Sequence, residues 1–141
     1  MEYQKFGNKY VLRLDKGDEV IESIKAVCRQ NAIKLGTVTG IGAINKAVIG
    51  IFESGTKKYH SKEVTGDMEI ASLTGNISEM NGEVYLHLHI TLTDSTYKAF
   101  GGHLNQAVIS CTGEIVLDVI EGQVDRAFSE EIGLNLIKFV G

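Results

Sequence analysis

Residues 85–93 read Tyr85-Leu-His-Leu-His-Ile-Thr-Leu-Thr93, with apolar side chains at every second position. A period of two is typical of a β-strand with one apolar and one polar face. On such a strand His87 and His89 share the polar face, with Cα atoms about 6.6 Å apart. The stretch therefore predicts a sheet whose apolar face covers a core and whose other face carries two neighbouring imidazoles.

A third histidine follows in the sequence Gly101-Gly-His-Leu104. Glycine adopts backbone conformations closed to other residues, so we expect Gly101 and Gly102 to bring His103 back over the strand. Histidine binds zinc at about 2.0–2.1 Å, and two imidazoles at strand positions i and i+2 can reach one ion. These three histidines form a candidate metal site. The alternative is a solvated sheet face and a turn residue, because short histidine pairs are weakly specific.

The remaining sequence predicts one helix and several more strands. Lys9–Leu14 alternates as a strand, and Asp18 is a suitable N-cap for an amphipathic helix of about three turns that ends near Asn31. Asn81-Gly82 is a strong hairpin signal. Other β-type segments cover residues 35–44, 46–52, 57–64, 68–78, 83–93, 108–111, 114–124 and 135–140. This pattern predicts an α+β fold, in which a strongly curled, largely antiparallel sheet carries a helix on one face.

Composition indicates one domain over residues 1–141, since this length is close to the modal domain size and 43% of the residues are hydrophobic. Several of the 16 glycines interrupt strand patterns, where glycine usually marks a bulge or bend, so we expect sharp sheet curvature. No apolar run approaches the roughly 20 residues that span a bilayer. The first residues also lack the layout of a signal peptide. We expect a cytoplasmic protein with no membrane partner.

Four sequence elements together resemble the plant and prokaryote conserved (PPC) domain, which also forms the C-terminal part of plant AT-hook nuclear proteins. They are Met68-Glu-Ile-Ala-Ser-Leu-Thr-Gly75, Leu86-His-Leu-His89, Thr93-Asp94 and Gly101-Gly-His-Leu104. The resemblance runs from Tyr10 to Val119 and implies a compact α+β fold that assembles as a homotrimer. In stand-alone prokaryotic members it also implies a metal ion, usually zinc, held by three histidines. Those ligands fall on His87, His89 and His103, with zinc or another divalent metal as the cofactor, and His60 matches no part of the pattern.

Three histidine ligands leave a fourth coordination position open, which favours binding of a water, an anion or a substrate. Fold-level relatives of the PPC domain include a zinc-dependent acetolactate decarboxylase and a three-histidine ester hydrolase. The resemblance thus suggests a metal-dependent lyase or hydrolase acting on a small acid, although fold alone does not fix function. We assign Glu69 and Glu114 a provisional role as acid, base or orienting partner. For both residues, a surface ion pair or an edge position is the alternative.

The charge of the chain bears on DNA binding. A net charge of −4 repels DNA on average, so a DNA-binding protein of this composition needs a concentrated basic face. Only Lys57-Lys58 with Lys62 approaches a basic cluster, and the Arg-Gly-Arg-Pro motif of an AT-hook is absent. A trimer could gather weak basic patches. Two alternatives to an enzyme therefore stay open: a DNA-associated regulator and a ligand-binding or scaffold trimer.

Overall fold

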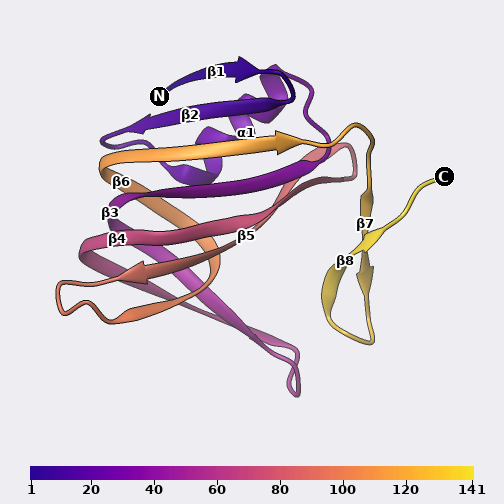
Figure 1. The fold of residues 1–141 in the computed structure, drawn as a ribbon. Coiled ribbons are helices and arrows are strands. Elements are labelled where there is room, and N and C mark those ends of the chain that lie inside the picture. Colours follow the sequence, from indigo (N-terminus) through magenta and orange to yellow (C-terminus); the bar gives the residue numbers. More distant parts are fainter.

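Eight strands and one helix make up the computed structural model, which describes residues 1–141 (Figure 1). In chain order they are β1 (Glu2–Phe6), β2 (Lys9–Asp15), α1 (Val20–Gln30), β3 (Gly36–Glu53), β4 (Lys58–Met80), β5 (Glu83–Thr93), β6 (Ala99–Val119), β7 (Asp125–Ser129) and β8 (Leu134–Lys138). No helix is both long enough and apolar enough to cross a membrane.

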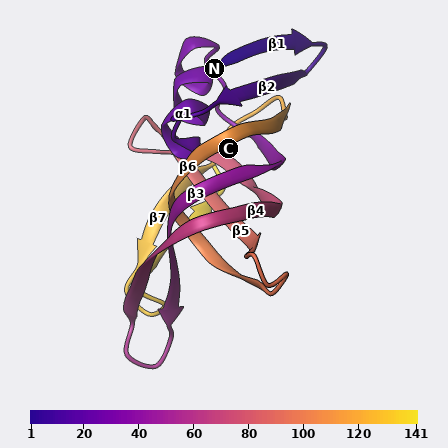
Figure 2. The ribbon, with the colours of Figure 1, turned by 90° about the vertical axis from the view of Figure 1, so that its left-hand side faces the viewer.

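Six strands form one antiparallel sheet in the order β1-β2-β6-β3-β4-β5. The beginning of β6 also pairs with β5, so strands β3 to β6 close into a ring. The pairing of β3 with β4 changes register between Gly40 and Gly42 and again between Ile44 and Lys46. Such bulges bend strands, which accounts for the curl of the sheet (Figure 2). The predicted antiparallel sheet with one helix is confirmed.

Helix α1 is capped by Glu19, whose carboxylate accepts hydrogen bonds from two backbone N–H groups of the first turn at 2.9 and 3.1 Å. The same carboxylate accepts a hydrogen bond from the backbone N–H of Ala107 in β6 at 3.1 Å. One side chain therefore both caps the helix and docks it on the sheet. The prediction that Asp18 is the N-cap was wrong, because its carboxylate instead accepts a hydrogen bond from the backbone N–H of Asp15 at 2.8 Å.

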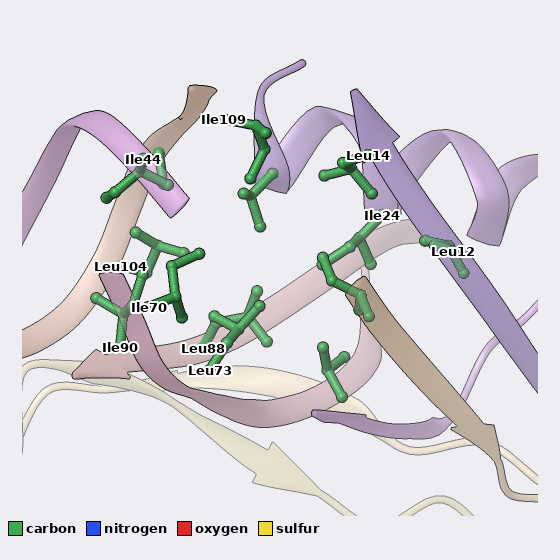
Figure 3. Close-up of a cluster of buried hydrophobic side chains, with 14 of the residues drawn as sticks. Leu12, Leu14, Ile24, Ile44, Ile70, Leu73, Leu88, Ile90, Leu104 and Ile109 are labelled. Carbon is green, nitrogen blue, oxygen red and sulfur yellow. The ribbon is translucent and has the colours of Figure 1, made fainter. Parts of the chain in front are cut away.

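The apolar faces of the helix and the ring of strands meet in a single core (Figure 3). The alternation of β5 turns Leu88, Ile90 and Leu92 into this core, where each is almost completely buried. Complete burial of one such side chain contributes about 1.5–3 kcal/mol. The apolar face thereby fixes the orientation of β5, and the polar face with its histidines is held on the other side of the strand.

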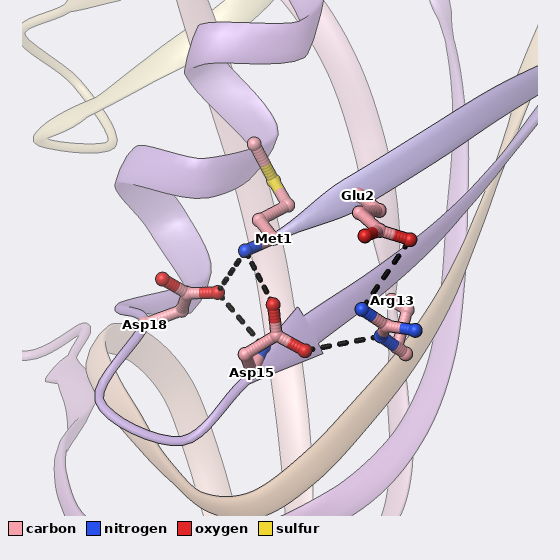
Figure 4. A network of polar contacts seen from close by, with 5 residues as sticks. All are labelled: Met1, Glu2, Arg13, Asp15 and Asp18. Atoms are coloured by element: carbon pink, nitrogen blue, oxygen red, sulfur yellow. Dashed lines mark hydrogen bonds and ion pairs between the residues drawn. The ribbon is translucent and has the colours of Figure 1, made fainter.

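Strand β1 was not predicted from the sequence, because its residues are all exposed and show no apolar alternation. A polar network joins this strand to the end of β2 and the start of the helix (Figure 4). The amino group of Met1 lies 2.7 Å from Asp15 Oδ2 and 3.0 Å from Asp18 Oδ2, and Arg13 Nε lies 3.0 Å from Asp15 Oδ1. Hydrogen bonding from the amino group lowers the pKa of Asp15 below its ordinary value. Exposed ion pairs contribute little stability, so this network mainly orients β1.

Long strands replace several shorter ones that the sequence predicts. Strand β3 joins the predicted segments 35–44 and 46–52, and β4 joins 57–64 and 68–78. Bulges interrupt the hydrogen-bond register without ending the strand, which is why local patterns suggest breaks there. The predicted terminal strand 135–140 corresponds to β8, and its partner β7 was missed. Together they form a separate two-stranded hairpin beside the large sheet (Figure 1).

Gly101 and Gly102 do bring His103 back over the histidine strand, but the unusual backbone conformations expected of them are absent. Both lie inside β6, and neither has a positive φ. Glycine is needed there for another reason: a Cβ at Gly101 would lie 2.0 Å from the carbonyl oxygen of Ile90 in β5. A Cβ at Gly102 would lie 2.5 Å from the carbonyl oxygen of Gly50 in β3. The two glycines allow β6 to approach both neighbouring strands closely.

We predict that Gly101→Ala destabilises the protein, because the added methyl group forces β6 away from β5. The free energy of unfolding should fall by about 1–3 kcal/mol, as for other overpacked sites, and urea denaturation measures it. Gly55→Ala is the matched control. Its added Cβ meets no atom within 4 Å, and we expect a change of no more than about 0.5 kcal/mol. Equal stability of the two variants would contradict the close approach.

Candidate metal centre

Strands β5 and β6 bring the three predicted histidines together. His89 is the cross-strand partner of His103, and His87 lies two residues earlier on the same face of β5. The Nε2 atoms of His87 and His89 are 3.2 Å apart. Ring centroids within the cluster are separated by 5.1 to 5.8 Å, and one ring nitrogen from each histidine lies within 4.8 Å of the others.

This spacing fits a single metal ion. Three nitrogen ligands at 2.0–2.1 Å from a tetrahedral ion lie about 3.3 Å from one another, close to the distance between the Nε2 atoms of His87 and His89. All three ligand nitrogens lie within 4.8 Å of one another. Imidazole suits zinc and several other divalent metals. No cysteine or carboxylate joins the cluster, so its donor set leaves one tetrahedral position free.

The surroundings of His87 and His103 favour their neutral, metal-binding form. Burial lowers the pKa of His87, and the positive charges that His103, His89 and Arg126 can carry lower it further. Burial also lowers the pKa of His103, with a smaller contribution from His89. Because a metal binds the neutral imidazole, both side chains can donate a lone pair at neutral pH.

A cavity of about 820 Å³ opens over the three imidazoles. The long β3–β4 hairpin forms one side of it and contributes Phe52 and Tyr59. Tyr59 Oη donates a hydrogen bond to Asn105 Oδ1, and the Tyr59 ring meets His103 edge-on with centroids 5.8 Å apart. The phenol is thereby fixed against the histidine cluster. The apolar residues of range 134–137 in the β7–β8 hairpin line the cavity as well.

Arg126 of β7 also lines the cavity and is only 7% exposed. Its Nε donates to Ser78 Oγ at 2.8 Å and its Nη2 to Asn76 Oδ1 at 2.9 Å, both on β4. Its Nη1 donates to the carbonyl oxygen of Asn135 in β8 at 3.0 Å. Asn76 is the cross-strand partner of His87, so the guanidinium lies next to the histidine cluster. No aspartate, glutamate or lysine lines the cavity.

The two predicted carboxylates lie elsewhere in the chain. Glu69 is exposed and pairs with Thr93, toward the end of β5 and beyond the histidines. Glu114 is exposed and is the cross-strand backbone partner of Arg13 in β2. It borders a different depression on the outside of the sheet. Neither lines the cavity formed by one chain, and their role as acid or base stays a prediction.

Most residues of the cavity wall were not predicted from the sequence. The signal for Asn76 was present, because counting back from the Asn81-Gly82 turn places it opposite His87, as the structure has it. Arg126 carries no comparable signal. Its strand is short and pairs only with β8, and the hydrogen bonds that place it by the cluster come from residues about 50 positions earlier in the chain.

Comparison with known proteins gives a consistent family and fold. Residues 1–121 match the model of the Plants and Prokaryotes Conserved (PCC) domain, the domain that the sequence resembles. A solved structure from Bacteroides thetaiotaomicron, named as a candidate DNA-binding protein, is similar with 40% identity and a TM-score of 0.95, covering 98% of this chain and 96% of that one. A metal-containing protein from Archaeoglobus fulgidus is similar with 31% identity and a TM-score of 0.86, covering 97% and 98%.

A curated relative shows that similar sequence also occurs within larger proteins. The bifunctional protein GlmU of Synechococcus sp. (strain JA-3-3Ab) is 29% identical over 120 residues, which are 83% of this chain. The chain spans about a fifth of the length of that relative, as the match covers 18% of it. The family match ends before β7, so the hairpin that carries Arg126 lies outside it.

We predict that the metal-free protein loses stability as the pH falls below about 6.5, the ordinary pKa of histidine. Since the folded-state pKa of His87 and of His103 is lowered, the unfolded chain binds protons first, and stability must rise with pH in this range. Urea denaturation in the presence of a chelator, above and below this pH, measures the effect. The decrease should be smaller in His87→Gln, because glutamine does not titrate. An identical pH profile for both proteins would contradict the prediction.

Proposed function

Because this chain belongs to the Plants and Prokaryotes Conserved (PCC) domain family, we propose that it is a metal-binding protein in which His87, His89 and His103 hold one zinc or other divalent ion. One observation carries the proposal: three imidazoles from two paired strands converge until their nitrogens lie within 4.8 Å. The likeness to a metal-containing protein of Archaeoglobus fulgidus supports it. We propose that the fourth coordination position faces the cavity and receives a small-molecule ligand.

The proposed chemistry follows from that open position. A zinc ion bound by three histidines supplies Lewis acidity and a coordinated water whose pKa is near 7. Tyr59 and Asn105 offer polar groups beside His103, and the apolar hairpin residues 134, 136 and 137 line the other side of the cavity. A lyase or hydrolase acting on a small acid is the enzyme class that suits this arrangement. A non-catalytic ligand-binding protein is the alternative, because the cavity of one chain has no carboxylate to transfer protons.

We also propose that the protein is a cytoplasmic homotrimer. Ile41 is 56% exposed and Val11 44% exposed, and both border the depression on the outside of the sheet that includes Glu114. Burying such neighbouring apolar side chains between copies of the chain is favourable. For Glu69 or Glu114 to act as acid or base, either carboxylate would have to enter the cavity of a neighbouring subunit.

We expect the protein, purified without a metal-affinity step, to contain about one zinc or other divalent ion per chain. His87→Ala, His89→Ala and His103→Ala should each lose the metal, because two remaining imidazoles cannot complete the site. Elemental analysis measures the content, and sedimentation shows whether the trimer persists.

His60→Ala is the matched control for this experiment. His60 is exposed on the β3–β4 hairpin, where its Nε2 lies 3.2 Å from Glu53 Oε2, outside the cluster. We expect this variant to keep its metal. A parent protein that is purified without metal and resists loading with zinc would refute the proposed site.

A DNA-associated role is the second candidate, supported by the name of the similar Bacteroides thetaiotaomicron protein. The net charge of −4 opposes it. We predict no binding of labelled duplex DNA at physiological salt, measured by fluorescence anisotropy. A DNA-associated role would be supported if the protein bound the duplex, if this binding weakened steeply with added salt, and if the double substitution Lys57→Glu and Lys58→Glu abolished it.

A further inference from the structure

The cavity contains a buried positive charge with no acidic partner. Arg126 is 7% exposed, and its three hydrogen-bond acceptors are a hydroxyl, an amide oxygen and a backbone carbonyl. None of the ion pairs in the structure includes it. Charged side chains are rarely buried without a counter-ion, because the charge loses its hydration. The uncompensated guanidinium therefore indicates that the cavity is built for an anion.

The guanidinium also has N–H groups that donate no hydrogen bond within the chain. Arginine carries five N–H groups, and the three hydrogen bonds use one on each nitrogen. One N–H on Nη1 and one on Nη2 remain. Tyr85 fixes the plane of the group, since the guanidinium carbon lies 4.5 Å from the centroid of its ring. Two free N–H groups on a fixed planar group are well suited to bind a carboxylate.

The rest of the cavity wall defines the body of the ligand. Leu134, Leu136 and Ile137 are 40 to 44% exposed in the chain and line the cavity on the same hairpin as Arg126. They offer apolar surface to a hydrocarbon group. Arg126 is the only permanently charged side chain in the wall, so the protein itself compensates a single negative charge there.

We infer that the cavity binds a small organic monocarboxylate: its carboxylate contacts Arg126, its apolar body lies against residues 134–137, and its other end faces the three histidines. This deepens the proposed function and rests on it only for the end of the ligand that faces the metal. The arginine is a binding and specificity residue, supplied by the part of the chain outside the family match.

Arg126 also joins the hairpin to the large sheet, so the experiment must separate this structural role from ligand binding. Ser78→Ala removes one of the hydrogen bonds that hold the guanidinium but leaves its charge in place. Arg126→Gln removes the charge and keeps a polar side chain of moderate length. Arg126→Lys keeps the charge but lacks the planar pair of N–H groups.

The test is isothermal titration calorimetry, which measures the affinity of the metal-free and the zinc-loaded protein for pentanoate, pentanamide and inorganic phosphate. We expect pentanoate to bind at least about tenfold more tightly than the uncharged amide. Arg126→Gln should weaken pentanoate binding by about tenfold or more, leave the amide unaffected and retain zinc. Arg126→Lys should restore part of the affinity. Ser78→Ala should lower the thermal midpoint of unfolding but bind pentanoate within about twofold of the parent.

Three results would overturn the inference. The first is that Arg126→Gln binds pentanoate as tightly as the parent does. The second is that Ser78→Ala loses as much affinity as Arg126→Gln. Either result would mean that Arg126 only holds the hairpin on the sheet. Phosphate could bind more tightly than pentanoate in an Arg126-dependent manner, which would exclude the carboxylate class. The zinc content of the same samples is measured by elemental analysis, so that failure of the metal site can be distinguished from failure of the anion subsite. A protein without zinc that still binds pentanoate through Arg126 disproves the metal site and keeps the anion subsite.

Discussion

The close approach of β6 to β5 at Gly101 is the constraint on which the histidine cluster depends. The backbone of β6 lies so near the Ile90 carbonyl that no side chain fits between them. This pairing closes the ring of strands and sets His103 directly across from His89. Because the apolar face of β5 is packed into the core, neither strand can rotate to separate the imidazoles. The geometry of the cluster is therefore a property of the sheet rather than of a loop.

Two different kinds of environment meet in the cavity. At His87 and His103, burial lowers the pKa, which disfavours the protonated form and keeps the imidazole lone pairs available. A short distance away, neutral acceptors and the Tyr85 ring surround the guanidinium of Arg126 and hold it in place. Any divalent ion at the histidines would add to this positive charge, and no carboxylate in the wall offsets it. The cavity as a whole thus favours negatively charged ligands.

The sequence predicted what local patterns encode. Alternation along residues 85–93 identified β5 and put both of its histidines on one face, and the Asn81-Gly82 turn identified its hairpin with β4. The histidine motif also led to His103, although the reason given for its glycines was wrong. They permit close strand packing, which depends on where β3 and β5 lie. The role of Arg126 could not be predicted either, because its position by the cluster results from hydrogen bonds to residues that are remote in the chain.

The two halves of the cavity wall differ in how they are attached. The histidine strands share backbone hydrogen bonds with neighbours on both sides, so a change in one strand is transmitted around the ring. The β7–β8 hairpin shares no strand pairing with the large sheet. Side chains join the two: Arg126 donates to Ser78 and Asn76 of β4, Asn135 Nδ2 donates to Tyr85 Oη, and Lys57 Nζ donates to the carbonyl oxygen of Glu130. The backbone positions of the imidazoles therefore do not depend on strand pairing with this hairpin. Residues of this one short segment line one side of the cavity, so they can set which ligands fit while the imidazoles stay on the strands of the large sheet.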